Sequence, residues 1–139
     1  YQFGLAQRVD SPVVWNTPND LFGKVLGVVD GYDNGPLVSK LMESQAIRLE
    51  TASSDSVNLR KLRAKRMDMA SVDVQVFSFL KKQERLTDLE LNKRVTTPRL
   101  PLHVCFNTDP ESKKTMERLN RGLRGVRMDA IAKRYISEN

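Results

Sequence analysis

The sequence contains only one cysteine, Cys105, and one histidine, His103, in 139 residues. A single cysteine excludes an internal disulfide and any metal site built from cysteines. No nucleophile or acid stands at a spacing from the histidine that would form a catalytic set. We therefore interpret His103 as a structural or exposed residue, and we expect no enzymatic activity, no catalytic residues, no metal and no cofactor.

Long hydrophobic runs are also missing. No stretch approaches the roughly 20 apolar residues of a membrane helix, and residues 1–20 lack the basic start and apolar middle of a signal peptide. The sequence opens instead on YQFGLAQRV, in which Phe3, Leu5 and Val9 fit alternate positions of a strand. We expect no direct membrane insertion and interpret the chain as a piece of a larger protein.

Aromatic residues make up only 6% of the sequence, although 23 lysines and arginines against 17 acids give a net charge of +6. Nucleic-acid-binding domains usually cluster their basic residues on a recognisable motif or combine them with aromatic residues. Here the basic residues lie in helical stretches, at 60–66 and 113–127, with almost no aromatic residues between them. We interpret them as solvated helix faces, and nucleic acid is the third hypothesis for the partner; a steep loss of DNA affinity with salt would support it.

What is present is an alternation of strand and helix patterns. It requires right-handed crossovers and predicts an α/β fold with a doubly wound, mainly parallel sheet. The predicted strands are an opening strand and Val25–Val29, Ile47–Thr51, Met67–Val72, Leu89–Val95 and Leu100–Phe106. The predicted helices begin near Pro36, after Ser54 or Asp55, at Val74, at Asp109 and after Gly125.

Two polar loops should meet at one edge of this sheet, because ligands in such folds bind beyond the carboxyl ends of the strands. Asp30, Tyr32, Asp33 and Asn34 follow one predicted strand, and Asp73 follows another. Carboxylates close to a helix start repel an anion that its free N–H groups would otherwise attract. The rim therefore suits a cationic or ammonium-bearing group.

Simpler interpretations of these residues stay open. Asp73 could only cap its helix, and residues 33–35 could only form a turn. An EF-hand calcium loop starting at Asp30 is rejected, because its twelfth position would be Leu41, where a bidentate glutamate is required. For Trp15 we favour a packing role over ligand stacking.

Three segments together resemble the extracellular solute-binding proteins of family 3, the polar amino-acid-binding type of ABC importers, which have the type II periplasmic binding fold. They are DLFGKVLGVVDGY (20–32), LRAKRMDMASVD (62–73), with Asp68 and Asp73 five apart, and RLPLHVCFNTDPESKKTMERLNRGLRGVRMDAIAKRYI (99–136). The resemblance runs from about Ser11 to Ile136, and it rests on the order and spacing of these segments.

The resemblance implies two lobes that close on a solute. Residues 1–11 would be a strand crossing the hinge, and residues 12–98 would be the second lobe, which binds the solute. Residues 99–139 would be a return strand and C-terminal helices that normally pack on the first lobe, which is missing here. Without that lobe, the stripe of Met116, Leu119, Leu123, Ile131 and Tyr135 would be uncovered, and we predict a homodimer or another self-covering arrangement.

By the same resemblance, Asp73 would accept the ligand's α-ammonium group, while Gly31, Tyr32, Asp33 and Asn34 would line the cleft. The family usually has Ser or Thr where Tyr32 stands, and a glycine where Lys65 stands. A degenerate or differently specific binder is therefore one alternative.

The resemblance leads to a first hypothesis of function. It is a periplasmic solute-binding protein, with its signal peptide outside this chain, that binds a small polar, amino-acid-like solute and works with ABC transporter membrane subunits. The alternative is a sensory or regulatory module of the same fold, from a receptor or a cell-wall enzyme. The end of the sequence just after the last helix pattern favours the stand-alone binder.

Overall fold

A computed structural model describes residues 1–45, 47–95 and 97–138, which form two compact units, Tyr1–Leu100 and Pro101–Asn139. The predicted ranges 12–98 and 99–139 include positions 46, 96 and 139, which lie outside the described residues. The first unit contains β1 (Phe3–Arg8), η1 (Pro18–Leu21), β2 (Lys24–Val29), α1 (Gly35–Glu43), β3 (Ile47–Ala52), α2 (Asp55–Arg63), β4 (Met69–Asp73), α3 (Val74–Gln83) and β5 (Leu89–Leu91). The second contains α4 (Pro110–Leu123) and α5 (Met128–Glu138).

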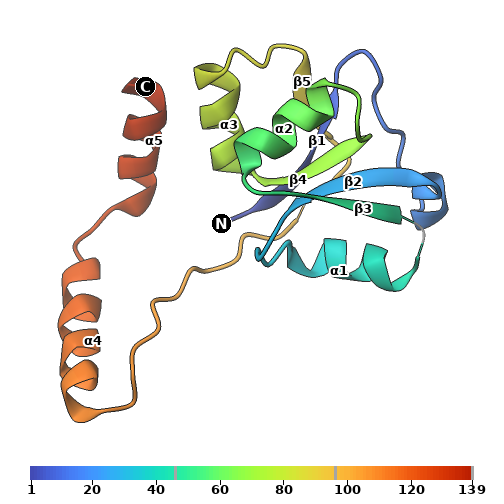
Figure 1. The fold of residues 1–139 in the computed structure, drawn as a ribbon. Coiled ribbons are helices and arrows are strands. Elements are labelled where there is room, and N and C mark those ends of the chain that lie inside the picture. Colours follow the sequence, from blue (N-terminus) through green and yellow to red (C-terminus); the bar gives the residue numbers. More distant parts are fainter. Residues whose placement is uncertain (46, 96, 139) are drawn as a thin grey trace. The chain divides into compact units, whose positions relative to one another are not determined.

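The five strands form one sheet in the order β3-β2-β4-β1-β5 (Figure 1). Strand β2 runs parallel to β3 and β4, whereas β1 is antiparallel to both of its neighbours, β4 and β5. Four strands therefore share one direction. The predicted mainly parallel α/β sheet is confirmed, with β1 as the exception.

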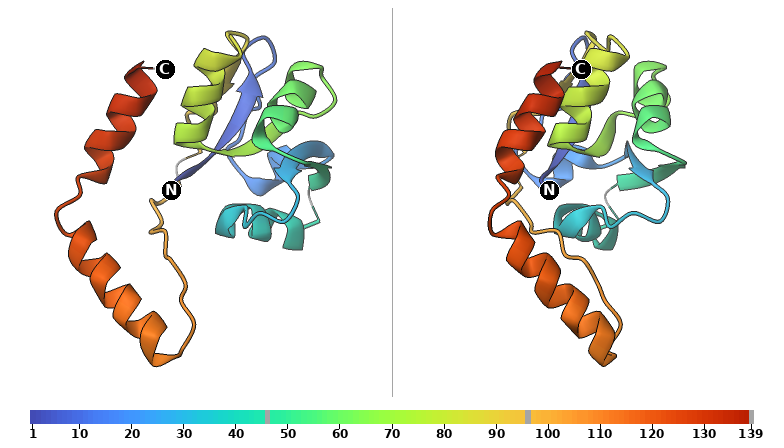
Figure 2. Two further views of the ribbon diagram at one scale, coloured as in Figure 1. Left: turned by 60° about the vertical axis from the view of Figure 1, so that its left-hand side comes forward. Right: turned by 90° about the vertical axis from the view of Figure 1, so that its left-hand side faces the viewer.

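Helices cover both faces of this sheet. Helices α2 and α3 lie side by side on one face, and α1 lies on the other (Figures 1 and 2). Successive strand residues alternate between two buried clusters, as the pleat requires: Val25 packs with α2 and α3, and Leu26 packs with α1. Trp15 packs, partly buried, against the α1 cluster, which confirms its predicted packing role.

Gly27 lets helix α2 approach the centre of the sheet. A Cβ atom at this position would lie 2.2 Å from Oδ1 of Asn58 and 2.2 Å from the sulfur of Met67, and both residues are almost fully buried. Asn58 belongs to the first turn of α2 and donates from Nδ2 to the carbonyl of Ser71 in β4 at 3.4 Å. The start of α2 is thereby held against the middle of β4.

Two predicted strands differ from the structure. Strand β5 ends at Leu91 rather than Val95, because Asn92 turns its side chain onto Gln7 and the carbonyl of Val13. The predicted strand Leu100–Phe106 is wrong: this stretch is irregular, and Leu102 is 79% exposed. A strand needs a neighbour to bond, and within the described residues no strand pairs with 101–106.

The apolar stripe of the C-terminal helices is not buried in this chain. Its members are half-buried or exposed in this chain: Met116, Leu119, Leu123, Ile131 and Tyr135. Helix α4 begins as predicted at Asp109, whose Oδ1 accepts hydrogen bonds from the backbone N–H groups of Glu111 and Ser112. The helices thus form from local signals and keep an uncovered apolar face.

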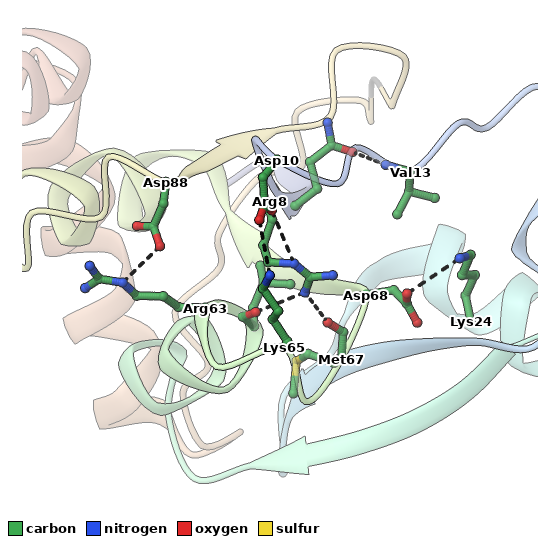
Figure 3. A network of polar contacts seen from close by, with 11 residues as sticks. Arg8, Asp10, Val13, Lys24, Arg63, Lys65, Met67, Asp68 and Asp88 are labelled. Atoms are coloured by element: carbon green, nitrogen blue, oxygen red, sulfur yellow. Dashed lines mark hydrogen bonds and ion pairs between the residues drawn. The ribbon is translucent and has the colours of Figure 1, made fainter.

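A buried arginine fixes the end of β1 (Figure 3). Arg8 is 9% exposed, and its guanidinium donates to the carbonyls of Leu62 at 3.1 Å and Met67 at 2.6 Å. These carbonyls lie at the carboxyl end of α2 and just before β4, where the helix dipole favours a cation. Asp10 lies 3.7 Å from the Nε of Arg8 and 3.3 Å from the Nζ of Lys65.

We predict that Arg8→Lys lowers the free energy of unfolding by about 1–3 kcal/mol, because an ammonium group cannot reproduce the two-carbonyl geometry of the guanidinium. Urea unfolding followed by circular dichroism measures the loss. Arg63→Lys is the matched control: its pair with Asp88, at 2.9 Å, lies between half-exposed side chains, and it should cost less than about 1 kcal/mol. Equal losses in both variants would contradict the role given to Arg8.

Candidate functional site

The carboxyl ends of β2, β3 and β4 lie at one edge of the sheet, together with the starts of α1, α2 and α3 and the start of β1 (Figure 1). Parallel strands bring their carboxyl ends to a common edge, and the antiparallel β1 adds its amino end. The predicted site residues 30–34 and Asp73 therefore both lie at this edge, which we call the carboxyl edge.

The loop between β2 and α1 is a tight turn. Gly31 and Gly35 have φ angles of +71° and +81°, which other residues rarely adopt. The backbone N–H of Gly35 donates to Oδ1 of Asp33 at 2.9 Å, and Nδ2 of Asn34 donates to the carbonyl of Tyr32 at 3.0 Å. Tyr32 itself is 57% exposed. The loop thus has the turn structure that was the simpler interpretation, and it presents an aromatic ring.

Asp73 caps helix α3. Its Oδ1 accepts from the backbone N–H groups of Gln75 at 2.8 Å and Val76 at 3.1 Å, and its Oδ2 accepts from the N–H of Gln2 at 2.9 Å. An ionised carboxylate has about four acceptor positions. Three are used here, so the capping interpretation describes this geometry and one acceptor position is left for another group.

Phe3 connects the two predicted loops. It is the register partner of Asp73 in the β1–β4 ladder. Its ring also lies against Gly35, where an added Cβ atom would come within 2.8 Å of it. The Phe3 ring makes an edge-on contact with Tyr1, with centroids 5.2 Å apart. The 30–35 loop and Asp73 are therefore held near each other by the first residues of β1.

A second carboxylate lies beside Asp73. Asp55 is the first residue of α2, after the cap Ser54, whose hydroxyl oxygen accepts from the N–H of Val57 at 3.3 Å. Partial burial, and then the negative charge of Asp73, raise the pKa of the Asp55 carboxyl above its ordinary value. From the sequence, Asp55 is a candidate only for a helix cap. Its position in the short connection between β3, which ends at Ala52, and α2 was the signal that could have placed it at the carboxyl edge.

A surface hollow of about 280 Å³ lies beneath the 30–34 loop. The whole loop lines it, so it gathers four of the five predicted binding residues, Gly31, Tyr32, Asp33 and Asn34. Its other walls come from β2, α1 and β3. Asp73 is not among the residues that line it.

Asp68 of the second sequence motif has a structural role at the opposite edge. Its Oδ2 accepts from the backbone N–H of Val25 at 2.9 Å, its own N–H donates to the carbonyl of Val25, and Lys24 lies 3.6 Å from its Oδ1. These bonds fix the start of β2 beside the segment that enters β4. Asp68 is therefore not part of the carboxyl edge.

Within residues 1–45, 47–95 and 97–138, no group of three or more histidine, cysteine or acidic side chains could hold a metal ion. In the same ranges no helix has both the length and the apolar character needed to cross a membrane.

Solved structures with a similar fold were found. An ancestral arginine-binding protein bound to arginine matches 99% of this chain with a TM-score of 0.74 and 18% sequence identity. Substrate binding domain 2 of GlnP from Lactococcus lactis, in an open conformation, matches 98% with a TM-score of 0.57 and 15% identity. The chain has the fold of one lobe of a periplasmic binding protein. The sequence resemblance is thus confirmed at the level of the fold.

This chain spans 58% and 56% of the length of those two proteins. A histidine kinase sensor domain with similarity to periplasmic binding proteins matches 66% of this chain, with a TM-score of 0.54 and 21% identity, and the match spans 39% of that domain. Neither a family model nor a curated protein matches the sequence.

We predict that the pKa of Asp55 lies above the ordinary value of 3.8 for an aspartate. The Asp73→Asn variant should lower the pKa of Asp55, but partial burial should keep it above the ordinary value. Because the folded-state pKa is raised, ionising Asp55 costs stability at neutral pH; this cost begins to shrink as the pH falls to the raised pKa and is gone below the ordinary value of the unfolded chain. Carboxyl ¹³C NMR titration measures both values.

Asp109 serves as an internal control in the same spectra, because hydrogen bonds from Ser112 hold its pKa below the ordinary range. An Asp55 pKa that does not respond to Asp73→Asn would show that the two carboxylates do not interact.

Proposed function

We propose that this chain is the second lobe and C-terminal part of a two-lobed solute-binding protein. One observation carries the proposal: the chain crosses the carboxyl edge twice, side by side. The Tyr1 amino group donates to the carbonyl of Leu100 at 2.7 Å, and the N–H of Leu100 donates back to Tyr1 at 2.8 Å. Gln2 donates from Nε2 to the carbonyl of Thr97 at 2.8 Å. Paired segments at this edge are what a hinge between two lobes requires.

In this proposal residues 1–11 cross the hinge, residues 12–98 bind the solute, and residues 99–139 return to the first lobe. The first lobe would then pair with residues 101–106 and cover the apolar stripe of α4 and α5. Made without that lobe, the chain would cover the stripe by pairing with a second copy of itself.

The solute would lie against the carboxyl edge and would be small and polar, with an amino-acid-like ammonium group. Gly31, Tyr32, Asp33 and Asn34 would contact it, and Asp73 would accept its ammonium group with the acceptor position that the cap leaves. The carboxylates of Asp30, Asp33, Asp55 and Asp73 favour a cation at this edge. Such a lobe binds and releases its solute without chemical change.

The protein would act in the periplasm and deliver its solute to the membrane subunits of an ABC importer. Nucleic acid is disfavoured as a partner, because several basic residues of α2 are already paired with acids. Arg60 pairs with Glu84, Lys61 with Glu50 and Arg63 with Asp88.

A sensory module is the second candidate, and the match to a histidine kinase sensor domain favours it. Both candidates bind the solute at the same site. They differ in the protein component that responds when the two lobes close on the solute. Solute uptake by membrane vesicles that hold the importer subunits, measured with and without the protein, separates them, since a sensor would leave uptake unchanged.

We predict that Asp73→Asn abolishes or strongly weakens solute binding by the complete two-lobed protein. Asparagine can still cap the helix with its one oxygen, so the variant removes the negative charge together with the Oδ2 acceptor that Gln2 uses. A thermal-shift panel of amino acids, polyamines and small organic acids gives the readout. A solute at about 100 times its dissociation constant stabilises the parent by roughly 2.7 kcal/mol.

Asp109→Asn is the matched control, because Asp109 caps α4 through the same two-bond geometry. It should keep the full shift. A panel in which no compound shifts the parent would remove the support for a solute binder, and a full shift in Asp73→Asn would reject Asp73 as the acceptor.

A further inference from the structure

The hollow beneath the 30–34 loop has walls of two kinds. Five of its twelve lining residues are aliphatic, namely Val28, Val29, Val38, Met42 and Leu49, and Ser39 and Thr51 contribute hydroxyl groups. Its volume of about 280 Å³ lies just below the usual range for ligand pockets, roughly 300–1,000 Å³. It is therefore large enough for a short chain of carbon atoms rather than for a large solute.

The charged groups that line the hollow are acidic. Asp30 and Asp33 both line it, and no lysine or arginine is among its described lining residues. Asp33 uses Oδ1 in its bond from the N–H of Gly35. Within the described ranges, no hydrogen bond or ion pair engages the carboxylate of Asp30. Both residues thus line the hollow and have carboxylate oxygens available.

Tyr32 adds a third feature that favours a cation. Tyr32 lines the hollow and is 57% exposed. The face of an aromatic ring attracts an ammonium or guanidinium group within about 6 Å. A hollow lined by aliphatic residues, a tyrosine and two aspartates suits a molecule with an apolar stem and a positive end.

We propose that this hollow binds a short alkyl chain that ends in a primary ammonium or a guanidinium group. The proposal rests on the proposed solute-binding function and deepens it, because it names the part of the solute that enters this lobe. A carboxylate or phosphate end would meet Asp30 and Asp33 and be repelled. A neutral alcohol would gain the aliphatic contacts alone, so it should bind more weakly than the cation of equal length.

The hollow lies wholly within residues 28–51, so the 139-residue chain itself can be tested. The probe is n-butylammonium, followed by amide chemical shifts in NMR titration, with n-butanol and butyrate as neutral and anionic probes of the same length. We expect n-butylammonium to shift the amides of 30–34 and of the α1 and β3 walls, with a dissociation constant in the millimolar range. Butyrate should cause no saturable shifts there.

Ser39→Lys places a positive charge in the hollow and should weaken the binding of n-butylammonium at least about tenfold. Ser78→Lys is the matched control and should leave the affinity unchanged. Both serines are exposed helix residues that donate to the carbonyl four residues before them, Ser39 to Gly35 at 3.3 Å and Ser78 to Val74 at 2.8 Å.

The proposal would be overturned if n-butanol and n-butylammonium bound with equal affinity. It would also be overturned if Ser39→Lys left the affinity for n-butylammonium unchanged, or if n-butylammonium shifted no amide at the hollow. These outcomes are separate from those of the Asp73 experiment. A complete protein that binds a solute through Asp73 while this hollow fails would keep the proposed function and lose only this inference.

Discussion

The antiparallel placement of β1 between β4 and β5 is the constraint on which the site depends. A strand in the opposite direction brings its amino end to the edge where the parallel strands finish. Phe3 therefore pairs with Asp73 and packs against Gly35, which joins two loops that are far apart in the sequence. The same strand carries Arg8 to the opposite edge, where its guanidinium bonds two carbonyls. One strand thus fixes both edges of the lobe.

Polar groups buried beside β1 show how firmly it is held. Gln7 donates to Glu90 at 2.9 Å, and its oxygen accepts from the N–H of Val13 and from Nδ2 of Asn92. Asn92 in turn donates to the carbonyl of Val13 at 2.9 Å. Buried polar groups with partners specify one arrangement, because a shifted strand would leave them unpaired. The loops at the carboxyl edge are therefore carried by a rigid frame, which is what a binding site needs.

Much of the fold could be predicted from the sequence, because its signals are local. A short apolar run marked β2, alternation of apolar residues marked β3, and the caps Ser54, Asp73 and Asp109 marked three helix starts. The predicted strand at 100–106 failed because alternation reports that a segment can pair, not that a partner is present. Asp55 was missed because its pKa depends on burial and on Asp73, neither of which is visible along the chain. Asp68 belongs to one of the segments that resemble the family, yet its bonds to Val25 hold the start of β2 and are structural.

Hydrogen–deuterium exchange of the complete two-lobed protein, with and without its bound solute, tests the central claim most directly. The account predicts slower exchange in the 30–35 loop and at the start of α3, with no change at η1 or around Asp68 on the opposite edge. Unchanged exchange at both carboxyl-edge segments, in a protein shown to hold its solute, would contradict the assignment of this edge as the solute site.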